Sequence, residues 1–455
     1  MSESMNFKEI NKEQFDMYFY GRSPYLKTFS QEIRWFKYEE NGIAILSTIV
    51  FCNIDKDFNA IVLGRDLNKK FRAINVLASF ESMDELLHDL NNCIPEMLSR
   101  HYNGAFMQGD ESPEPFSLFL SKVPEEKRNV YIKMLLEDPI HFPAYIVLEE
   151  LAYWFKDPDG IFIRDFHSES FNSRLFELYL NAVFYELDFE MNREYNQPDF
   201  LLSKFGEEIS VEAVSIAETE DPLERKVVDE QQMDELREHV LKVMPFKFAR
   251  SLLKKSRHRP EPAKVHYWEL EHTKNKPFII AMQDYSKRMS MAFSSEALHS
   301  YLYGIDIESG ESIEQHTDKN RSIKSNFFAT EQNNHISAVL LTTQATVPKF
   351  NRMGILAGVE ANGFKIYVNG VKTDDNANPH PFSADVSDPN YQEPWCTAAY
   401  MYHNPNAVHP VDYRLFPNIV HIFQKNDHFE QLVPKNYIIQ STTLVLKTKQ
   451  PSNRN

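Results

Sequence analysis

The feature that most constrains the fold is a glutamate, Glu177, inside a helix that is otherwise almost entirely apolar. Residues 171–187 read FNSRLFELYLNAVFYEL. The apolar side chains cover so much of the helix circumference that this helix must lie in a core. An ionised carboxylate there is costly unless it is paired or holds a metal ion. Arg174 stands three residues earlier and can form an ion pair with it, so Glu177 alone supports either interpretation.

The composition predicts a globular chain without membrane spans or disulfides. With 455 residues, of which 42% are hydrophobic, the chain is long enough for two or three domains with separate cores. Its longest apolar run, residues 43–52, is far shorter than the roughly 18 residues of a membrane span, and the N-terminus lacks the layout of a secretion signal. Cys52, Cys93 and Cys396 are too scattered for a zinc site or a disulfide framework. We therefore expect a cytoplasmic protein with no membrane partner.

The pattern of apolar residues predicts a mixed α/β (α+β) chain in four parts. Residues 1–103 form an N-terminal α+β domain, residues 104–160 a linker with helices, residues 161–290 a central core, and residues 291–455 a β-rich region. Within these parts, strands are expected at 32–38, 43–51, 59–64, 276–285, 336–343, 364–368 and 442–447. Helices are expected at 82–98, 130–137 and 144–155, and a polar loop at 317–326.

Residues 197–214 predict a β-hairpin that brings two further acids together. If residues 203 and 208 close the hairpin, antiparallel pairing places Asp199 opposite Glu212. Glu212 then points away from the face shared by its β-branched neighbours, and Glu177 can approach from the helix. Carboxylates, together with a backbone carbonyl such as that of Ala213, suit Mg²⁺ or Mn²⁺ better than zinc. The three acids therefore predict a divalent-metal site.

One strongly basic segment, residues 242–259, stands in a chain whose net charge is −17. Pro245 can occupy the first turn of a helix, and Phe248 with Leu252 would then mark its buried face. A solvated helix face is the simplest explanation of such a charge run. Binding to an anionic partner is the alternative, because few acids lie nearby. The candidates for phosphate contacts are Lys247, Arg250, Lys254, Arg257 and Arg259.

Glu177, Pro198-Asp199 and the segment Glu212-Ala213-Val214 resemble the PD-(D/E)XK nuclease superfamily. The resemblance implies a restriction-endonuclease-like mixed sheet flanked by helices, with Glu177, Asp199, Glu212 and the Ala213 carbonyl holding Mg²⁺ or Mn²⁺. It also implies an endonuclease that hydrolyses phosphodiester bonds, with DNA as the expected nucleic-acid partner. Val214 stands where that superfamily has its catalytic lysine.

A lysine from a neighbouring helix can replace the missing one, as other members of the superfamily illustrate. Lys255 and Lys254 are the candidates, since both lie in the basic segment that follows the hairpin. Together with Glu177, Asp199 and Glu212, they complete the expected catalytic set.

Several segments also resemble a widespread family of bacterial proteins without a settled function, over most of the chain. The matching segments are 171–180, 198–200, 211–214, 267–270, 349–354 and 403–407. This resemblance implies that the C-terminal region belongs to the same unit as the core. For a bacterial nuclease of this kind, defence against foreign DNA, as in antiviral systems, is the expected role.

Other interpretations of the sequence remain open. The protein can be a catalytically inactive relative that binds nucleic acid or acts as a scaffold, alone, as a homo-oligomer or with an accessory protein. It can also be a binding protein whose C-terminal region recognises a partner. His403, His409 and His421 match no familiar zinc spacing and are expected to be structural. Residues 349–354 are expected to form a phosphate-contacting loop or a simple turn.

Overall fold

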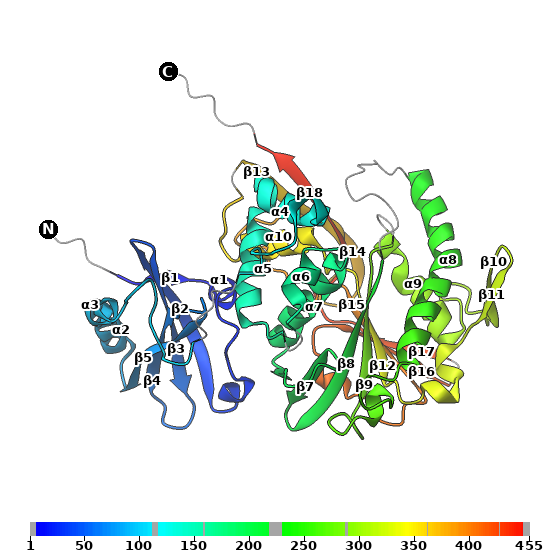
Figure 1. Ribbon diagram of the computed structural model, residues 1–455, viewed down its shortest axis with the longest axis horizontal. Coiled ribbons are helices and arrows are strands. Elements are labelled where there is room, and N and C mark those ends of the chain that lie inside the picture. Colours follow the sequence, from blue (N-terminus) through cyan, green and yellow to red (C-terminus); the bar gives the residue numbers. More distant parts are fainter. Residues whose placement is uncertain are drawn as a thin grey trace, which may run out of the picture. The chain divides into compact units, whose positions relative to one another are not determined.

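The computed structural model describes residues 6–111, 117–157, 160–217, 230–286, 290–361, 363–426 and 428–448 (Figure 1). The protein is a mixed α/β structure in two compact units. The first unit comprises residues 1–156, 350–365 and 447–455, and the second comprises residues 157–349 and 366–446. Residues 104–111 and 117–156 of the expected linker thus group with the N-terminal region, and most of the C-terminal region groups with the central core. Residues 112–116 and 158–159 of that linker lie outside the described residues.

The first unit contains a five-stranded antiparallel sheet in the order β1-β2-β3-β4-β5. Two helices cover one face of it, where Leu86 and Ile94 pack against Ile49 and Val62. The strands expected at 32–38, 43–51 and 59–64 are confirmed, and Ser82 caps the following helix. The bounds are β1 Lys8–Ile10, β2 Ser30–Glu40, β3 Ile43–Cys52, β4 Phe58–Arg65, β5 Phe71–Phe80, α1 Lys12–Asp16, α2 Met83–Asn92 and α3 Ile94–Ser99.

The expected helices of the linker are also confirmed, as α4 (Val130–Glu137) and α5 (Phe142–Trp154). Residues 349–354 were expected to form a loop or turn, which is wrong, because they lie inside α10 (Val347–Leu356). The Asn351 side chain accepts a hydrogen bond at 3.0 Å from the N–H of Ala144 at the start of α5. The polar residues of this segment are therefore used for internal packing.

The second unit contains an eight-stranded mixed sheet in the order β17-β16-β15-β12-β9-β8-β7-β6. Strands β8, β9 and β12 run parallel, and β9 is buried along its whole length, as its apolar sequence predicts. The strands of this sheet are β6 Glu190–Asn192, β7 Phe200–Lys204, β8 Glu207–Ile216, β9 Phe278–Asp284, β12 Ala338–Thr342, β15 Ala399–His403, β16 Val420–Lys425 and β17 His428–Leu432. A small sheet contains β13 (Phe364–Thr373), β14 (Pro379–Asp385) and β18 (Ile438–Lys447).

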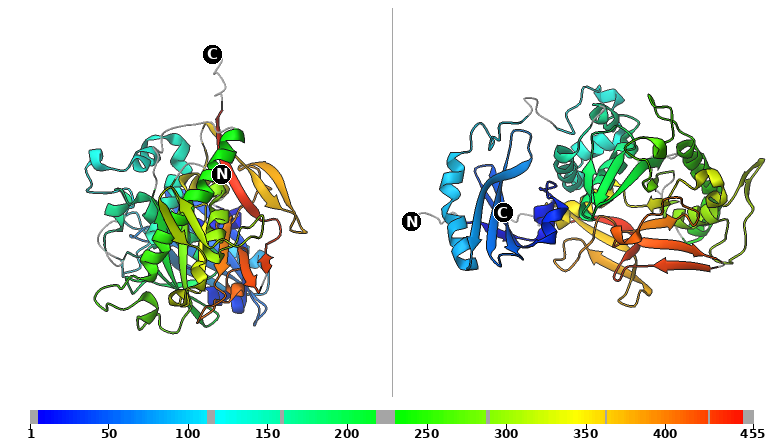
Figure 2. Two further views of the ribbon diagram at one scale, coloured as in Figure 1. Left: turned by 90° about the vertical axis from the view of Figure 1, so that its right-hand side faces the viewer. Right: turned by 90° about the horizontal axis from the view of Figure 1, so that it is seen from below.

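Two helices cover opposite faces of the eight-stranded sheet, as the views in Figure 1 and Figure 2 show. The Ser215 side chain of β8 hydrogen-bonds Ser173 of α7 (Phe171–Glu186) at 2.7 Å. The adjacent Val214 points to the other face, where it shares a core with Phe248 of α8 (Glu230–Ser256). This unit also contains the α-helices α6 (Phe162–Phe166) and α9 (Ser294–Tyr303). Among the described residues, no helix has the length and apolar character needed to cross a bilayer.

Two local predictions for this unit are wrong. Pro245 does not begin a helix but lies inside α8. The buried residues Val240, Met244 and Phe248 continue one apolar stripe past it, and this packing offsets the backbone hydrogen bond that proline cannot make. The expected loop at 317–326 contains most of a small hairpin, β10 (Gln315–Asp318) and β11 (Arg321–Lys324).

A buried histidine in α9 predicts that acid destabilises this unit. His299 is 1% exposed, lies among the rings of Tyr303, Tyr402 and Phe429, and has no hydrogen-bond partner on either ring nitrogen. Burial lowers its pKa to about 4, although Asp306 opposes the shift. Between that pKa and the ordinary value near 6.5 the unfolded chain binds more protons, so stability falls as the pH drops through this window.

We expect His299→Phe to reduce this acid destabilisation by about 1 kcal/mol per pH unit between pH 6.5 and 4. Urea unfolding at pH 4.5, 5.5 and 7 measures the effect. Replacement of the exposed His428 by glutamine serves as the control for substitution of a histidine at the surface. Equal pH dependence in the wild type and His299→Phe would contradict the prediction.

Candidate active site

The predicted hairpin register is confirmed, and it brings two of the candidate acids together. Ser203 pairs with Glu208 and Phe200 pairs with Val211, so Asp199 stands opposite Glu212 at the start of β7. The N–H of Asp199 donates to Oε2 of Glu212 at 3.3 Å. The N–H of Ala213, the next residue in β8, donates to Oδ2 of Asp199 at 2.7 Å. The two carboxylates thus share one network of backbone hydrogen bonds.

Glu212 is 3% exposed and receives two side-chain donors from outside the hairpin. The ammonium group of Lys255, in the last turn of α8, forms a close hydrogen-bonded ion pair with Oε1. The hydroxyl of Tyr267, at the start of the 3₁₀ helix η4 (Tyr267–Glu269), donates to the same oxygen at 2.8 Å. Lys255 is therefore placed directly against Glu212, the acid two residues before Val214 in β8.

The third acid, Glu177, projects from α7 and forms an ion pair. Its side chain is 13% exposed, and Nη1 of Arg174 lies 2.9 Å from Oε1 and 3.0 Å from Oε2. Nη2 of Arg174 also donates to Asp165 at 2.9 Å. The ion pair that the spacing of Arg174 and Glu177 allowed is thus present, and Glu177 is compensated without a metal ion.

The electrostatics of the three acids show that they are crowded. Burial and the nearby charge of Asp199 raise the pKa of Glu177 to about 8. Burial and repulsion by Glu212 raise the pKa of Asp199 to about 7, while Lys255 pulls it down. Burial lowers the pKa of Lys255, but the attraction of Glu212 and Asp199 is stronger in sum and leaves it raised. A further positive charge at this position would therefore be favourable.

The three acids are neighbours, but their oxygens do not form a closed metal-ligand set. In the described parts of the chain, the group of acidic or sulfur side chains whose ligand atoms all lie within 4.8 Å of one another is Cys52, Asp55 and Asp57. That group sits in the turn after β3, with Asp55 exposed. The donor chemistry of Glu177, Asp199 and Glu212, all oxygen, fits Mg²⁺ or Mn²⁺. Shared coordination requires their side chains to move closer together.

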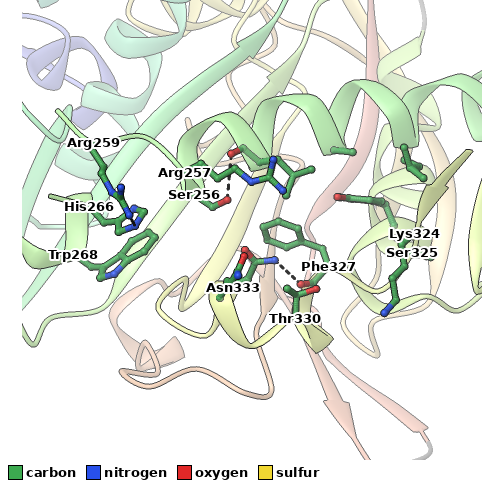
Figure 3. A pocket seen from close by; sticks show the side chains of 15 residues that line it. Ser256, Arg257, Arg259, His266, Trp268, Lys324, Ser325, Phe327, Thr330 and Asn333 are labelled. Carbon is green, nitrogen blue, oxygen red and sulfur yellow. Dashed lines mark hydrogen bonds between the residues drawn. The ribbon is translucent and has the colours of Figure 1, made fainter. Parts of the chain in front are cut away.

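The basic candidates are placed in different surroundings. Lys255 contacts Glu212, whereas the adjacent Lys254 and Arg250 are exposed on α8. Lys247 is half-buried in the middle of α8. Arg257 and Arg259, which follow the last residue of α8, are exposed and line a pocket that is shown in Figure 3.

Two residues near the site were not identified from the sequence. Tyr267 belongs to the matching segment 267–270 but is not among the predicted site residues, because its contact with Glu212 depends on the fold. Arg193 donates to the backbone oxygen of Asp199 at 3.0 Å and to the side chain of Asn181 at 3.2 Å. Burial lowers the pKa of Arg193 to about 10. Its polar sequence surroundings gave no signal of this role.

The histidines of the C-terminal region contact one another and the backbone. Nε2 of His403 lies 2.9 Å from Nδ1 of His421, whose other ring nitrogen lies 3.0 Å from the backbone oxygen of Phe416. Burial lowers the pKa of His403 to about 3. These contacts fit the structural role expected for both residues.

A comparison of the chain with known protein families, curated proteins and solved structures found no match. The geometry and electrostatics of the site therefore provide the basis for a functional proposal.

Proposed function

We propose that the protein is a metal-dependent nuclease that hydrolyses phosphodiester bonds, with DNA as its substrate. The main support is the arrangement at Glu212, where a lysine from α8 contacts an acid of the hairpin and a second acid, Asp199, stands opposite. The order α7, β7, β8, α8, β9 is also the order of helix, hairpin, helix and strand expected of a restriction-endonuclease-like core.

In this proposal, Glu177, Asp199, Glu212 and the Ala213 carbonyl hold Mg²⁺ or Mn²⁺. The ion supplies Lewis acidity, which lowers the pKa of bound water and stabilises charge on the scissile phosphate. Lys255 would contact the phosphate or orient the attacking water once Glu212 binds the ion. The position of Lys255 allows a metal ion to replace its ammonium group at Glu212, because that group already lies against the oxygen that the ion would contact.

A second candidate is a nuclease-fold protein that binds nucleic acid without cleaving it. The ion pairs of Glu177 with Arg174 and of Glu212 with Lys255 favour it, because both acids are compensated by the protein itself. In that case the cations stabilise the fold and compete with any metal ion. Direct measurement of metal binding and cleavage separates the two candidates.

We expect purified protein to cleave DNA in Mg²⁺ or Mn²⁺, and Glu212→Ala to lose at least about 100-fold of that activity. The substrates are plasmid, linear duplex, single-stranded DNA and RNA, incubated with each metal and with EDTA. Glu212 is chosen because it contacts Lys255 and lies opposite Asp199. Equal cleavage by both proteins would indicate a contaminating nuclease and contradict the proposal.

Metal binding provides a readout that does not depend on catalysis. Mn²⁺ is expected to raise the midpoint of thermal unfolding of the wild type, since a ligand that binds the folded state stabilises it. Asp199→Asn keeps an oxygen that can accept the Ala213 hydrogen bond but removes the charge, so its unfolding midpoint should respond much less. If neither protein responds to Mn²⁺ and neither cleaves, the non-catalytic candidate is favoured.

A further inference from the structure

A pocket of about 690 Å³ lies in the second unit, alongside the C-terminal turns of α8. Its walls come from α8, the segment that follows it, α9, β11 and the short helices η6 (Phe327–Ala329) and η7 (Glu331–Asn333). In Figure 3, Arg259 and His266 lie beside Trp268 on one side of the pocket, Lys324 lies on the other, and Arg257 lies between them. The volume is within the range of small-ligand sites in proteins.

The pocket is basic although the protein is acidic. Its lining includes Arg257, Arg259 and Lys324 and contains no aspartate or glutamate, in a chain whose net charge is −17. In the part of the chain that the structure describes, none of these three cations forms an ion pair with a carboxylate. Their nearby polar contact is between Nη2 of Arg259 and Nε2 of His266, at 3.3 Å. Three uncompensated cations around one cavity favour an anionic ligand.

The pocket also offers aromatic and amide groups. The rings of His266 and of His335, which lies outside the lining, stack on Trp268, with centroids 4.7 and 5.2 Å away and planes within 5°. Trp268 is 8% exposed, so the half-buried His266 presents the more accessible aromatic ring on this side. Phe327 forms part of the lining on the side of α9, and Gln332 adds an exposed amide that can donate and accept hydrogen bonds. This combination suits a planar heterocycle with polar edges, in addition to a phosphate group.

We propose that this pocket binds a nucleotide unit, with its phosphate held by Arg257 and its base on the side that carries Arg259, His266 and Trp268, while Lys324 adds positive charge on the opposite side. The unit is either a free nucleotide or the terminal nucleotide of a strand, since both present the same chemistry. This proposal is independent of the nuclease proposal, because none of the pocket residues is one of the three acids.

The position of the pocket links its ligand to the candidate active site. Ser256, in its lining, directly follows Lys255, and Trp268 directly follows Tyr267. Lys255 and Tyr267 are the two side chains that hold Glu212. A ligand that contacts both segments is placed to alter how Glu212 is held, and binding at either site would then affect the other.

Calorimetric titration in EDTA tests the pocket without any contribution from metal binding or cleavage. The probes are AMP, adenosine, inorganic phosphate and a 5′-phosphorylated tetranucleotide. AMP or the tetranucleotide is expected to bind at least about tenfold more tightly than either adenosine or phosphate, because only they contain both parts. If AMP binds more tightly than the tetranucleotide, the natural ligand is a free nucleotide. If the tetranucleotide binds more tightly, the natural ligand is the end of a strand.

Arg257→Ala is expected to weaken this binding about tenfold or more, through loss of a charge-assisted hydrogen bond. Lys274→Ala, an exposed lysine outside the pocket, is the matched control and should bind like the wild type. Because Arg257 is exposed, its replacement should leave the thermal unfolding midpoint unchanged. The proposal is overturned if neither AMP nor the tetranucleotide binds below about 1 mM. The proposal is also overturned if phosphate binds as tightly as AMP. It is likewise overturned if Arg257→Ala binds AMP and the tetranucleotide as tightly as the wild type does.

Discussion

Lys349→Met is expected to lower the free energy of unfolding by about 3–5 kcal/mol. The side chains of Lys349 and Glu393 are both fully buried, with Nζ 2.6 Å from Oε1, and Nζ also donates to the backbone oxygen of Pro394 at 2.6 Å. Methionine matches the volume of lysine but leaves Glu393 buried without its cation. The midpoint of thermal unfolding should fall by on the order of 10 °C.

A second substitution separates the lost charge from lost packing. In the double variant Lys349→Met with Glu393→Gln, the buried negative charge is also removed, so about half or more of the lost stability should return. Lys274→Met, at an exposed position, provides the control. A fall in the unfolding midpoint of less than about 2 °C for Lys349→Met would show that the pair is not a major source of stability.

Lys349 also illustrates what the sequence could not predict. A lysine and an arginine within residues 349–354 are typical of a surface loop, yet Lys349 is 0% and Arg352 is 2% exposed. Their burial depends on partners far along the chain, such as Glu393 for Lys349, and pairing over that distance leaves no local pattern. Pro245 was misplaced for a related reason, since packing across α8 outweighs the local preference of proline.

The hairpin was predicted well because its signals are local. Alternation of side chains and the short turn at Gly206 fixed the pairing of Ser203 with Glu208, and this pairing set Asp199 opposite Glu212. The candidate lysines were also found from their position after the hairpin. The choice between Lys255 and Lys254 was not possible from sequence, because it depends on the rotation of α8 against β8.

The hydrogen bonds that Glu212 accepts from Lys255 and Tyr267 could not be predicted in full from the sequence. Tyr267 contacts it from a segment 55 positions away, and the distance between the oxygens of Glu177 and the other acids depends on how α7 packs. The sequence identified residues with suitable chemistry, but the structure shows that protein cations compensate two of the three acids. A metal ion bound by these acids would therefore have to displace the two cations.

Lys255→Met tests whether this lysine acts in cleavage, in stability or in both. If Lys255 acts on the phosphate, Lys255→Met should reduce cleavage at least about 100-fold. Loss of its pair with Glu212, which is almost fully buried, should also lower the free energy of unfolding by about 2 kcal/mol. Cleavage rates and urea unfolding measure the two effects. Lys254→Met should cause a smaller loss of activity, since that side chain is exposed and makes no contact with Glu212.

The double variant Lys255→Met with Glu212→Gln distinguishes a functional lysine from a structural one. Removal of both charges should restore most of the stability lost in Lys255→Met, because no buried charge is then left unpaired. Activity should stay absent if both residues act in hydrolysis. Metal-induced stabilisation should survive in Lys255→Met and disappear when Glu212 is replaced as well. Wild-type cleavage by Lys255→Met would exclude it as the substitute for the lysine missing at Val214. Loss of metal-induced stabilisation in Lys255→Met alone would instead show that the lysine is needed to position Glu212.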